Sequence, residues 1–257
     1  MDRVSACAED LMAYRSLGQG AASEDLGWAI LTNIPGPNPM LGAAARIRAD
    51  GIEAARVIEE ATRWFSERGR SNCSFWLGPS TICEGLQAAL ADAGAESLPP
   101  IAAMVLCGEP PIVPGADVRE VASMADYAEF LDIAFELEDQ TASVRDATLE
   151  QVGPQYASYC DNENRTAFLC SLNGVAVAAG MVQITTQPGI AALFASAARK
   201  AARGNGCYRA LVRARYEAAR AAGCPDVVTQ ASLFSRPILE RLGFEKVADV
   251  TVWVLEW

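Results

Sequence analysis

The chain contains no histidine among its 257 residues. A histidine base, a Ser-His-Asp triad and a histidine metal ligand are therefore excluded. Proton transfer would have to use carboxylate, tyrosine, cysteine, serine or water. The eight cysteines stand apart, without the close pairs that bind zinc or carry out redox exchange, so we expect free thiols and no metal.

The sequence also lacks long apolar runs and an excess of basic residues. No run approaches the length of a membrane-spanning helix, and residues 1–5 lack the basic and apolar regions of a secretory signal, so we expect a cytoplasmic protein without a membrane partner. The net charge of −11 argues against general nucleic-acid binding. With 51% hydrophobic and 21% charged residues, the composition is that of a globular protein.

A proline-rich segment divides the chain into two predicted domains. Residues 109–115 hold three prolines and a glycine, which oppose both helix and sheet. We therefore predict domains at residues 1–108 and 118–257. In the first, the pattern predicts helices at 4–17, 51–68 and 82–93 and strands at 28–32, 74–77 and 101–106.

The second domain is predicted to be a mostly antiparallel sheet flanked by helices, which makes the fold class α/β (α+β). Strands are expected at 118–121, 166–171, 175–185, 190–197 and 227–229, and residues 247–257 close the sheet as one or two strands. Helices are expected at 124–136, 147–160 and 207–222. The Asn173-Gly174 pair predicts a tight hairpin, because both turn positions favour positive φ.

The turn Arg203-Gly204-Asn205-Gly206 is the strongest functional signal. It lies between an apolar strand and a helix, an arrangement that directs several backbone N–H groups at one point and so suits an anionic ligand such as phosphate. Basic residues gather around this turn in an otherwise acidic protein, which predicts a local basic site; they are Arg199, Lys200, Arg203, Arg209, Arg213 and Arg215.

Together with residues 230–244, which end in Leu242-Gly243-Phe244, this turn resembles the core of the GNAT (N-acetyltransferase) superfamily. The resemblance covers about residues 118–257. The Gly78-Pro79 turn, the helix ending at Ala93-Gly94 and the strand with Met104 resemble the degenerate first half of tandem, two-domain GNAT proteins. An unrelated α/β domain and an elaboration of a single fold are open alternatives for this half.

The resemblance implies acetyl-CoA or another acyl-CoA as co-substrate. Backbone amides of the turn and the helix start would wrap the coenzyme A pyrophosphate, and main-chain groups of the preceding strand would face the pantetheine arm. The implied coenzyme-binding residues are Ser196, Ala198, Arg203, Gly204, Asn205, Gly206, Cys207 and Tyr208. Simple packing is the alternative role for Cys207 and Tyr208.

The sequence departs from the family pattern at the positions that supply catalytic side chains. Leu239 stands where many members have a tyrosine acid, and residues 190–198 hold no carboxylate base. The remaining catalytic candidates are Ser232, Ser235 and Glu136, the last with Glu138 and Asp139. A helix N-cap is the alternative for Ser235, and a solvated helix end for the acidic cluster.

The function implied is an acyl-CoA-dependent N-acyltransferase that acts on a small amine. Two alternatives stay open: a GNAT-fold transferase that takes its acyl group from aminoacyl-tRNA or a carrier protein, and a non-catalytic acyl-CoA-binding protein. Apart from transfer RNA as a donor, no nucleic-acid partner is expected. The sequence leaves the oligomeric state and the acceptor open.

Overall fold

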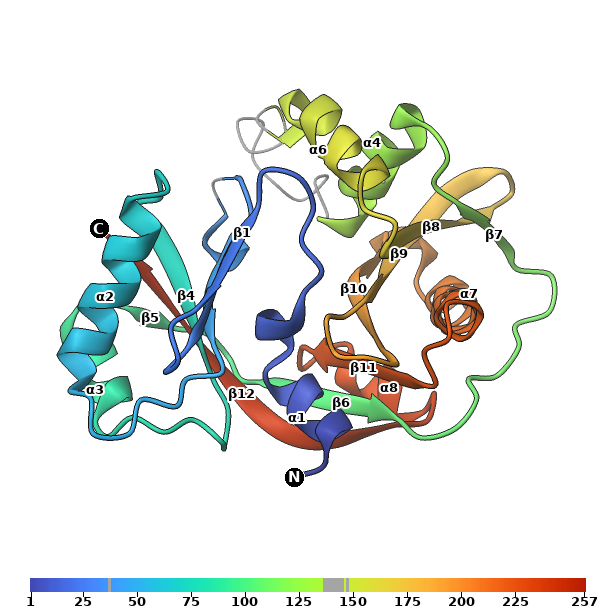
Figure 1. Ribbon diagram of the computed structural model, residues 1–257. Helices are drawn as coiled ribbons and strands as arrows, with labels where there is room; N and C mark the ends of the chain where they lie inside the picture. The colour runs from blue at the N-terminus through green and yellow to red at the C-terminus, as the bar shows by residue number, and fades with distance from the viewer. Residues whose placement is uncertain (37, 136–145, 147) are drawn as a thin grey trace. The chain divides into compact units, whose positions relative to one another are not determined.

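The computed structural model describes residues 1–36, 38–135, 146 and 148–257 (Figure 1). Its contacts divide the chain into two compact units, each of which is treated by itself below. Unit 1 comprises Met1–Val105, Gln230–Glu240 and Glu245–Trp257. Unit 2 comprises Leu106–Thr229 and Arg241–Phe244.

Unit 1 is built on a mixed sheet that includes the last strand of the chain. β1 pairs with β2, β2 with β3 and β4 with β12 in antiparallel fashion, whereas β3 and β4 run parallel. The strands are β1 (Ala22–Asp25), β2 (Ile30–Asn33), β3 (Gly42–Ala45), β4 (Asn72–Leu77), β5 (Glu96–Ser97), β6 (Ile101–Leu106) and β12 (Phe244–Glu256). The helices are α1 (Arg3–Glu9), η1 (Leu11–Tyr14), η2 (Pro39–Leu41), α2 (Ala54–Ser66), α3 (Leu86–Asp92) and α8 (Arg236–Glu240).

Helix α2 supplies much of the unit 1 core. Val57, Ala61, Trp64 and Phe65 recur at helical spacing and are all buried, so one face of the helix packs on the sheet. Strand β4 is buried over nearly its whole length, as expected for a central strand with neighbours on both sides.

Unit 2 holds an antiparallel meander followed by one parallel strand. β7 (Asp117–Glu120), β8 (Arg165–Leu172), β9 (Val175–Ile184) and β10 (Ile190–Ala198) pair successively and antiparallel. β11 (Asp226–Ala231), which begins in this unit, then pairs in parallel with β10. The helices are α4 (Met124–Ala134), α6 (Val152–Cys160), η4 (Lys200–Ala202) and α7 (Cys207–Ala221).

The helices of unit 2 cover both faces of this sheet. α7 contacts β8, β9 and β10, and α4 contacts the same strands together with α6. Tyr127 and Phe130 of α4 are buried in one cluster with Ala167 and Leu169 of β8. Because side chains alternate across a strand, Phe168 and Cys170 lie on the opposite face of β8.

The predicted fold class is confirmed: the structure has a mixed sheet, mostly antiparallel, with flanking helices. The Asn173-Gly174 hairpin is also confirmed, with φ of 52° and 78°. The expected helix at 4–17 is instead two short pieces, because the helical hydrogen bonding changes at the α1 C-cap, Asp10. Strand β3 was missed because its sequence, Gly-Ala-Ala-Ala, carries no strand preference.

The last strand differs from the expectation in its partner. It is one continuous strand and pairs with β4 in unit 1, from Thr251↔Leu77 to Glu256↔Asn72. The contact-defined units therefore assign most of residues 230–257 to unit 1. The domain limits 1–108 and 118–257 stay a prediction.

Candidate active site

Strand β10 contains a bulge in its middle. It pairs with β9 from Ala191↔Ile184 to Phe194↔Met181, and again at Ala197↔Ala179. Two residues, Ala195 and Ser196, therefore lie opposite one residue of β9, Gly180. Ala195 has a φ of 48°, the left-handed conformation that a bulge can require.

The bulge changes what the edge of β10 presents. The parallel pairing with β11 extends from Ile190↔Asp226 to Leu193↔Thr229, just before the bulge. Beyond it, the Arg199 N–H donates to Val177 of β9 at 2.8 Å, so the main-chain groups of Ala198 point away from β9. This is the edge that the sequence assigned to the pantetheine arm.

The turn after β10 has the backbone shape of an anion site. Gly204 and Gly206 have φ of 88° and 82°, values that glycine adopts without strain. Gly206 is the N-cap of α7, and no side chain caps this helix end. The first helical hydrogen bond runs from Ala210 N to Gly206 O at 2.9 Å, so the preceding N–H groups of the first turn have no acceptor within the helix.

Space is available in front of this turn. Among the described residues, a Cβ atom added at Gly204 would meet nothing within 4 Å, and one at Gly206 would meet only Val113 Cγ1 at 3.5 Å. The Asn205 side-chain amide donates to Ala202 O at 3.1 Å, and Arg203 Nε donates to Ala198 O at 3.2 Å. These contacts hold the turn, in which Gly204 and Asn205 are exposed and Gly206 is half-buried.

The basic cluster expected around the turn is only partly present. Arg199 is paired with Asp132 at 2.5 Å, and Arg213 is paired with Glu109 at 2.5 Å and Glu217 at 2.6 Å. Arg215 is fully buried. Lys200, Arg203 and Arg209 are exposed, so they are the residues of the predicted set that lie at the surface near the turn.

A buried polar group, Arg215, contacts the bulge, although the sequence predicted it to be part of the basic cluster around the turn. Arg215 donates to Ser196 Oγ of β10 and, at 2.9 Å, to Leu211 O of α7. Tyr208 also interacts with it; burial raises the pKa of the tyrosine, and the neighbouring guanidinium opposes that shift. Arg215 follows Cys207 and Leu211 at intervals of four, on the buried side of α7, and this spacing is the signal that could have located it.

The catalytic candidates lie either in a different unit from the turn or outside the described residues. Ser232 and Ser235 belong to unit 1, whereas the turn belongs to unit 2. Their hydroxyl oxygens lie 3.2 Å apart, and Ser235 donates to Ser232 O at 3.4 Å. Glu136, like Glu138 and Asp139, lies outside the described residues.

Unit 1 contains a similar strand arrangement whose corresponding edge is occupied. Arg46 has a φ of 52° and lies two residues after the last β3–β4 pair, Ala44↔Phe75, just as Ala195 follows Leu193. Here, however, Ile82 inserts as a bridge partner of Arg48. Its N–H donates to Ile47 O at 3.0 Å, and its carbonyl accepts from the Ala49 N–H at 2.6 Å. The chain itself fills the position that is exposed after the bulge in unit 2.

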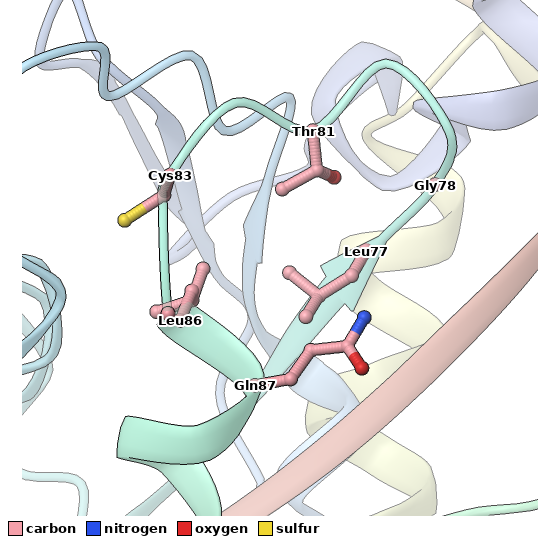
Figure 2. Close-up of a pocket in the computed structure, with 7 residues that line it drawn as sticks. Leu77, Gly78, Thr81, Cys83, Leu86 and Gln87 are labelled. Atoms are coloured by element: carbon pink, nitrogen blue, oxygen red, sulfur yellow. The ribbon is translucent and has the colours of Figure 1, made fainter.

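A small hollow follows β4 in the same unit (Figure 2). It has a volume of about 290 Å³ and is lined by Leu77, Gly78, Thr81, Cys83, Gly85, Leu86 and Gln87. Figure 2 shows Leu77 and Gln87 pointing toward each other across it. Thr81 Oγ1 is buried and has no hydrogen-bond partner within the described chain.

The described residues contain neither a metal-binding cluster nor a membrane-spanning helix. No group of three or more cysteine, aspartate or glutamate side chains is placed to hold a metal ion. No helix in that part of the chain is long and apolar enough to cross a membrane.

Comparison with known proteins agrees with this geometry. The model of the acetyltransferase (GNAT) family matches residues 129–244, a span that includes the bulged strand, the glycine turn and α7. Residues 129–244 form a GNAT acetyltransferase domain. No curated protein matches the sequence at a significant level.

Solved structures share the GNAT fold across nearly the whole chain. A GCN5-related N-acetyltransferase from Kribbella flavida superposes with a TM-score of 0.66 at 16% identity, over 99% of this chain and 96% of its own. A tandem GNAT protein from the clavulanic acid biosynthesis pathway gives 0.57 at 15% identity, over 100% and 88%. A GCN5-related N-acetyltransferase from Sphaerobacter thermophilus gives 0.56 at 16% identity, over 93% and 82%. At these identities, the similarity establishes the fold.

Proposed function

We propose that the protein is an acyl-CoA-dependent N-acyltransferase that acts on a small amine. The observation that carries the proposal is the uncapped N-terminus of α7 behind Gly204 and Gly206, at the end of a bulged strand within a GNAT domain. Backbone N–H groups and the helix dipole at this point suit the pyrophosphate of acetyl-CoA or another acyl-CoA.

The edge of β10 would hold the pantetheine arm. The main chain of Ala198 points away from β9, and its carbonyl, which accepts from Arg203 Nε, keeps a second lone pair. We expect Ala198 and Ser196 to pair with amides of the arm, as a neighbouring strand would. A free N–H of this edge would also stabilise the oxyanion that forms when the amine attacks the thioester carbonyl. The C–S bond then breaks, and the amine loses a proton as the coenzyme thiolate leaves.

Positioning carries most of the catalysis in this scheme. Strand β10 holds no carboxylate, and Leu239 cannot donate a proton. Holding an amine against a thioester can lower the barrier by about 7 to 11 kcal/mol in favourable cases. Ser232 and Ser235 remain the proposed proton-transfer groups among the described residues.

A thermal-shift measurement followed by an activity assay tests the proposal. Coenzyme A or acetyl-CoA should raise the melting temperature, because a ligand that binds only the native state stabilises it by mass action. A panel of small amines with acetyl-CoA should then release thiol. If neither coenzyme shifts the melting temperature at millimolar concentration, the proposed function is wrong.

The missing acid and base favour a second candidate, a non-catalytic acyl-CoA-binding protein. This candidate predicts the same thermal shift but no thiol release with any amine. Detectable transfer that is lost in Gly206→Asp would exclude it.

We also propose that unit 1 is a degenerate copy of the GNAT fold that binds no coenzyme. The Ile82 bridge already satisfies the main-chain groups that follow Arg46, so a pantetheine arm would find no edge to pair with. Titration calorimetry should therefore give one coenzyme per chain.

A further inference from the structure

We propose that Arg215 is a positioning residue, which holds the bulge of β10 in the shape that binds the coenzyme. The inference rests on the proposed function, because the bulge matters for activity only if β10 contacts the acyl-CoA. Arg215 itself would touch neither the coenzyme nor the amine.

The burial of Arg215 needs an explanation other than packing. The side chain is 0% exposed. Its hydrogen-bond acceptors among the described residues are Ser196 Oγ, Leu211 O and Met181 O, and none of them is a carboxylate. Its Nη2 atom has no hydrogen-bond partner in this part of the structure. Burial lowers its pKa to about 10. An apolar side chain of similar volume would avoid the cost of burying the charge, so the arginine is more than a filler of the core.

The hydrogen bonds of Arg215 lie on the bulge and beside it. Its Nη1 atom donates to Ser196 Oγ and reaches Met181 O of β9 at 3.5 Å. Ser196 is the second bulge residue, and Met181 is the partner of Phe194, the last residue before the bulge. The guanidinium therefore contacts both sides of the interruption and draws the Ser196 side chain toward α7.

Arg215 also reaches the helix start that follows the glycine turn. Its side chain interacts with Tyr208 in the first turn of α7. Because Arg215 is itself a residue of α7, its hydrogen bond to Ser196 connects this helix with the bulged strand. The two segments are those assigned to the pyrophosphate and the pantetheine arm, and we expect this bond to fix the spacing between them.

Gly180 provides the room for this guanidinium. A Cβ atom at Gly180 would lie 2.9 Å from Arg215 Cζ and 3.0 Å from Nη1. A side chain at the surface could swing away, but Arg215 is enclosed on all sides. Gly180→Ala should therefore displace the guanidinium from Ser196.

The first test compares Arg215→Met with Arg220→Met, a matched control at an exposed arginine in the last turn of the same helix. We expect Arg215→Met to keep or raise the melting temperature, because a buried charge is removed. Its dissociation constant for coenzyme A should rise at least tenfold, whereas Arg220→Met should bind like the wild type. Unchanged affinity in Arg215→Met would overturn the proposal.

Two further variants keep the inference testable if Arg215→Met does not fold. Ser196→Ala removes only the hydroxyl that Arg215 contacts and should weaken coenzyme binding about three- to tenfold, with a lower melting temperature because the buried guanidinium loses an acceptor. Gly180→Ala should weaken binding alone, and combining it with Arg215→Met should add no further loss, because both changes act through one contact. Additive losses, or wild-type affinity in Ser196→Ala, would contradict it.

The outcome is distinguishable from a failure of the proposed function. If the wild-type protein binds no coenzyme, the function itself is wrong, whatever the variants do. If the wild type binds and the Arg215 and Ser196 variants bind equally well, only the positioning role is wrong.

Discussion

A charge placed at Gly204 gives the sharpest test of the coenzyme site. Gly204→Asp and Gly204→Asn introduce side chains of nearly equal size and shape, and they differ by one negative charge. Both must adopt the φ of 88°. Asp and Asn tolerate this conformation better than most residues, so each should cost about 1 kcal/mol of stability. Space is available, since no atom of the part of the chain that the structure describes lies within 4 Å of the added Cβ.

The two variants should separate in coenzyme binding. Two unit charges 5 Å apart repel by about 3 kcal/mol at an effective dielectric constant near 20, and salt reduces this at a surface. We therefore expect Asp to bind at least tenfold more weakly than Asn. With ligand at 100 times the wild-type dissociation constant, a tenfold loss lowers the stabilisation from about 2.7 to about 1.4 kcal/mol.

Differential scanning fluorimetry measures this directly. For a protein of this size, 1 kcal/mol corresponds to about 2–4 °C in melting temperature. Without ligand the two variants should melt at similar temperatures. With coenzyme A they should differ by several degrees, and the difference should shrink in 1 M salt. Equal coenzyme shifts in Asp and Asn would refute the assignment of a phosphate group to this turn.

Four further predictions follow from the structure. Ser235→Ala and Ser232→Ala should each change the free energy of unfolding by less than about 0.5 kcal/mol, since both hydroxyls bond mainly to one another. Each variant should lower kcat without changing the affinity for the coenzyme. A change in affinity alone would show that these serines are not catalytic. Calorimetry should give one coenzyme per chain, and two would disprove the closed edge in unit 1. Of the eight thiols, the exposed Cys107 and Cys160 should react fastest with a disulfide reagent at pH 8, while Cys73, whose pKa burial raises to about 12, should react only on unfolding. Arg70→Met should destabilise the protein by about 2 kcal/mol or more without affecting coenzyme binding. The reason is that Arg70 donates to several carbonyl groups in unit 1, among them Asn38 O at 2.7 Å. An unchanged melting temperature would show that these hydrogen bonds contribute little to stability.

Much of the fold was predictable because its local signals are strong. The Asn173-Gly174 turn, the strand at 101–106 and the helix from Cys207 all follow from turn chemistry and hydrophobic period. The sequence could not indicate where β12 pairs. A strand pattern shows which residues are extended, whereas its partner depends on contacts far away in the sequence, here with β4.

The backbone part of the site was predictable, and the side-chain part was not. Glycines at 204 and 206 specify positive φ, so the turn could be located from residue types alone. The bulge left no such mark, because its left-handed residue is an alanine, Ala195. Arg215 was misplaced because arginines usually lie at the surface, and composition outweighed its helical spacing.

The pairing of β12 with β4 has a consequence for how the protein is made. Residues 72–77 leave the ribosome long before residues 251–256, yet the two strands are neighbours in the same sheet. During synthesis one edge of β4 therefore stays unpaired until residues 251–256 have been made. Until then this edge can pair with other chains or bind chaperones. Truncations or fusions that disturb Phe244–Glu256 should accordingly impair unit 1, most of which is synthesised first. The glycine turn lies outside both of these strands.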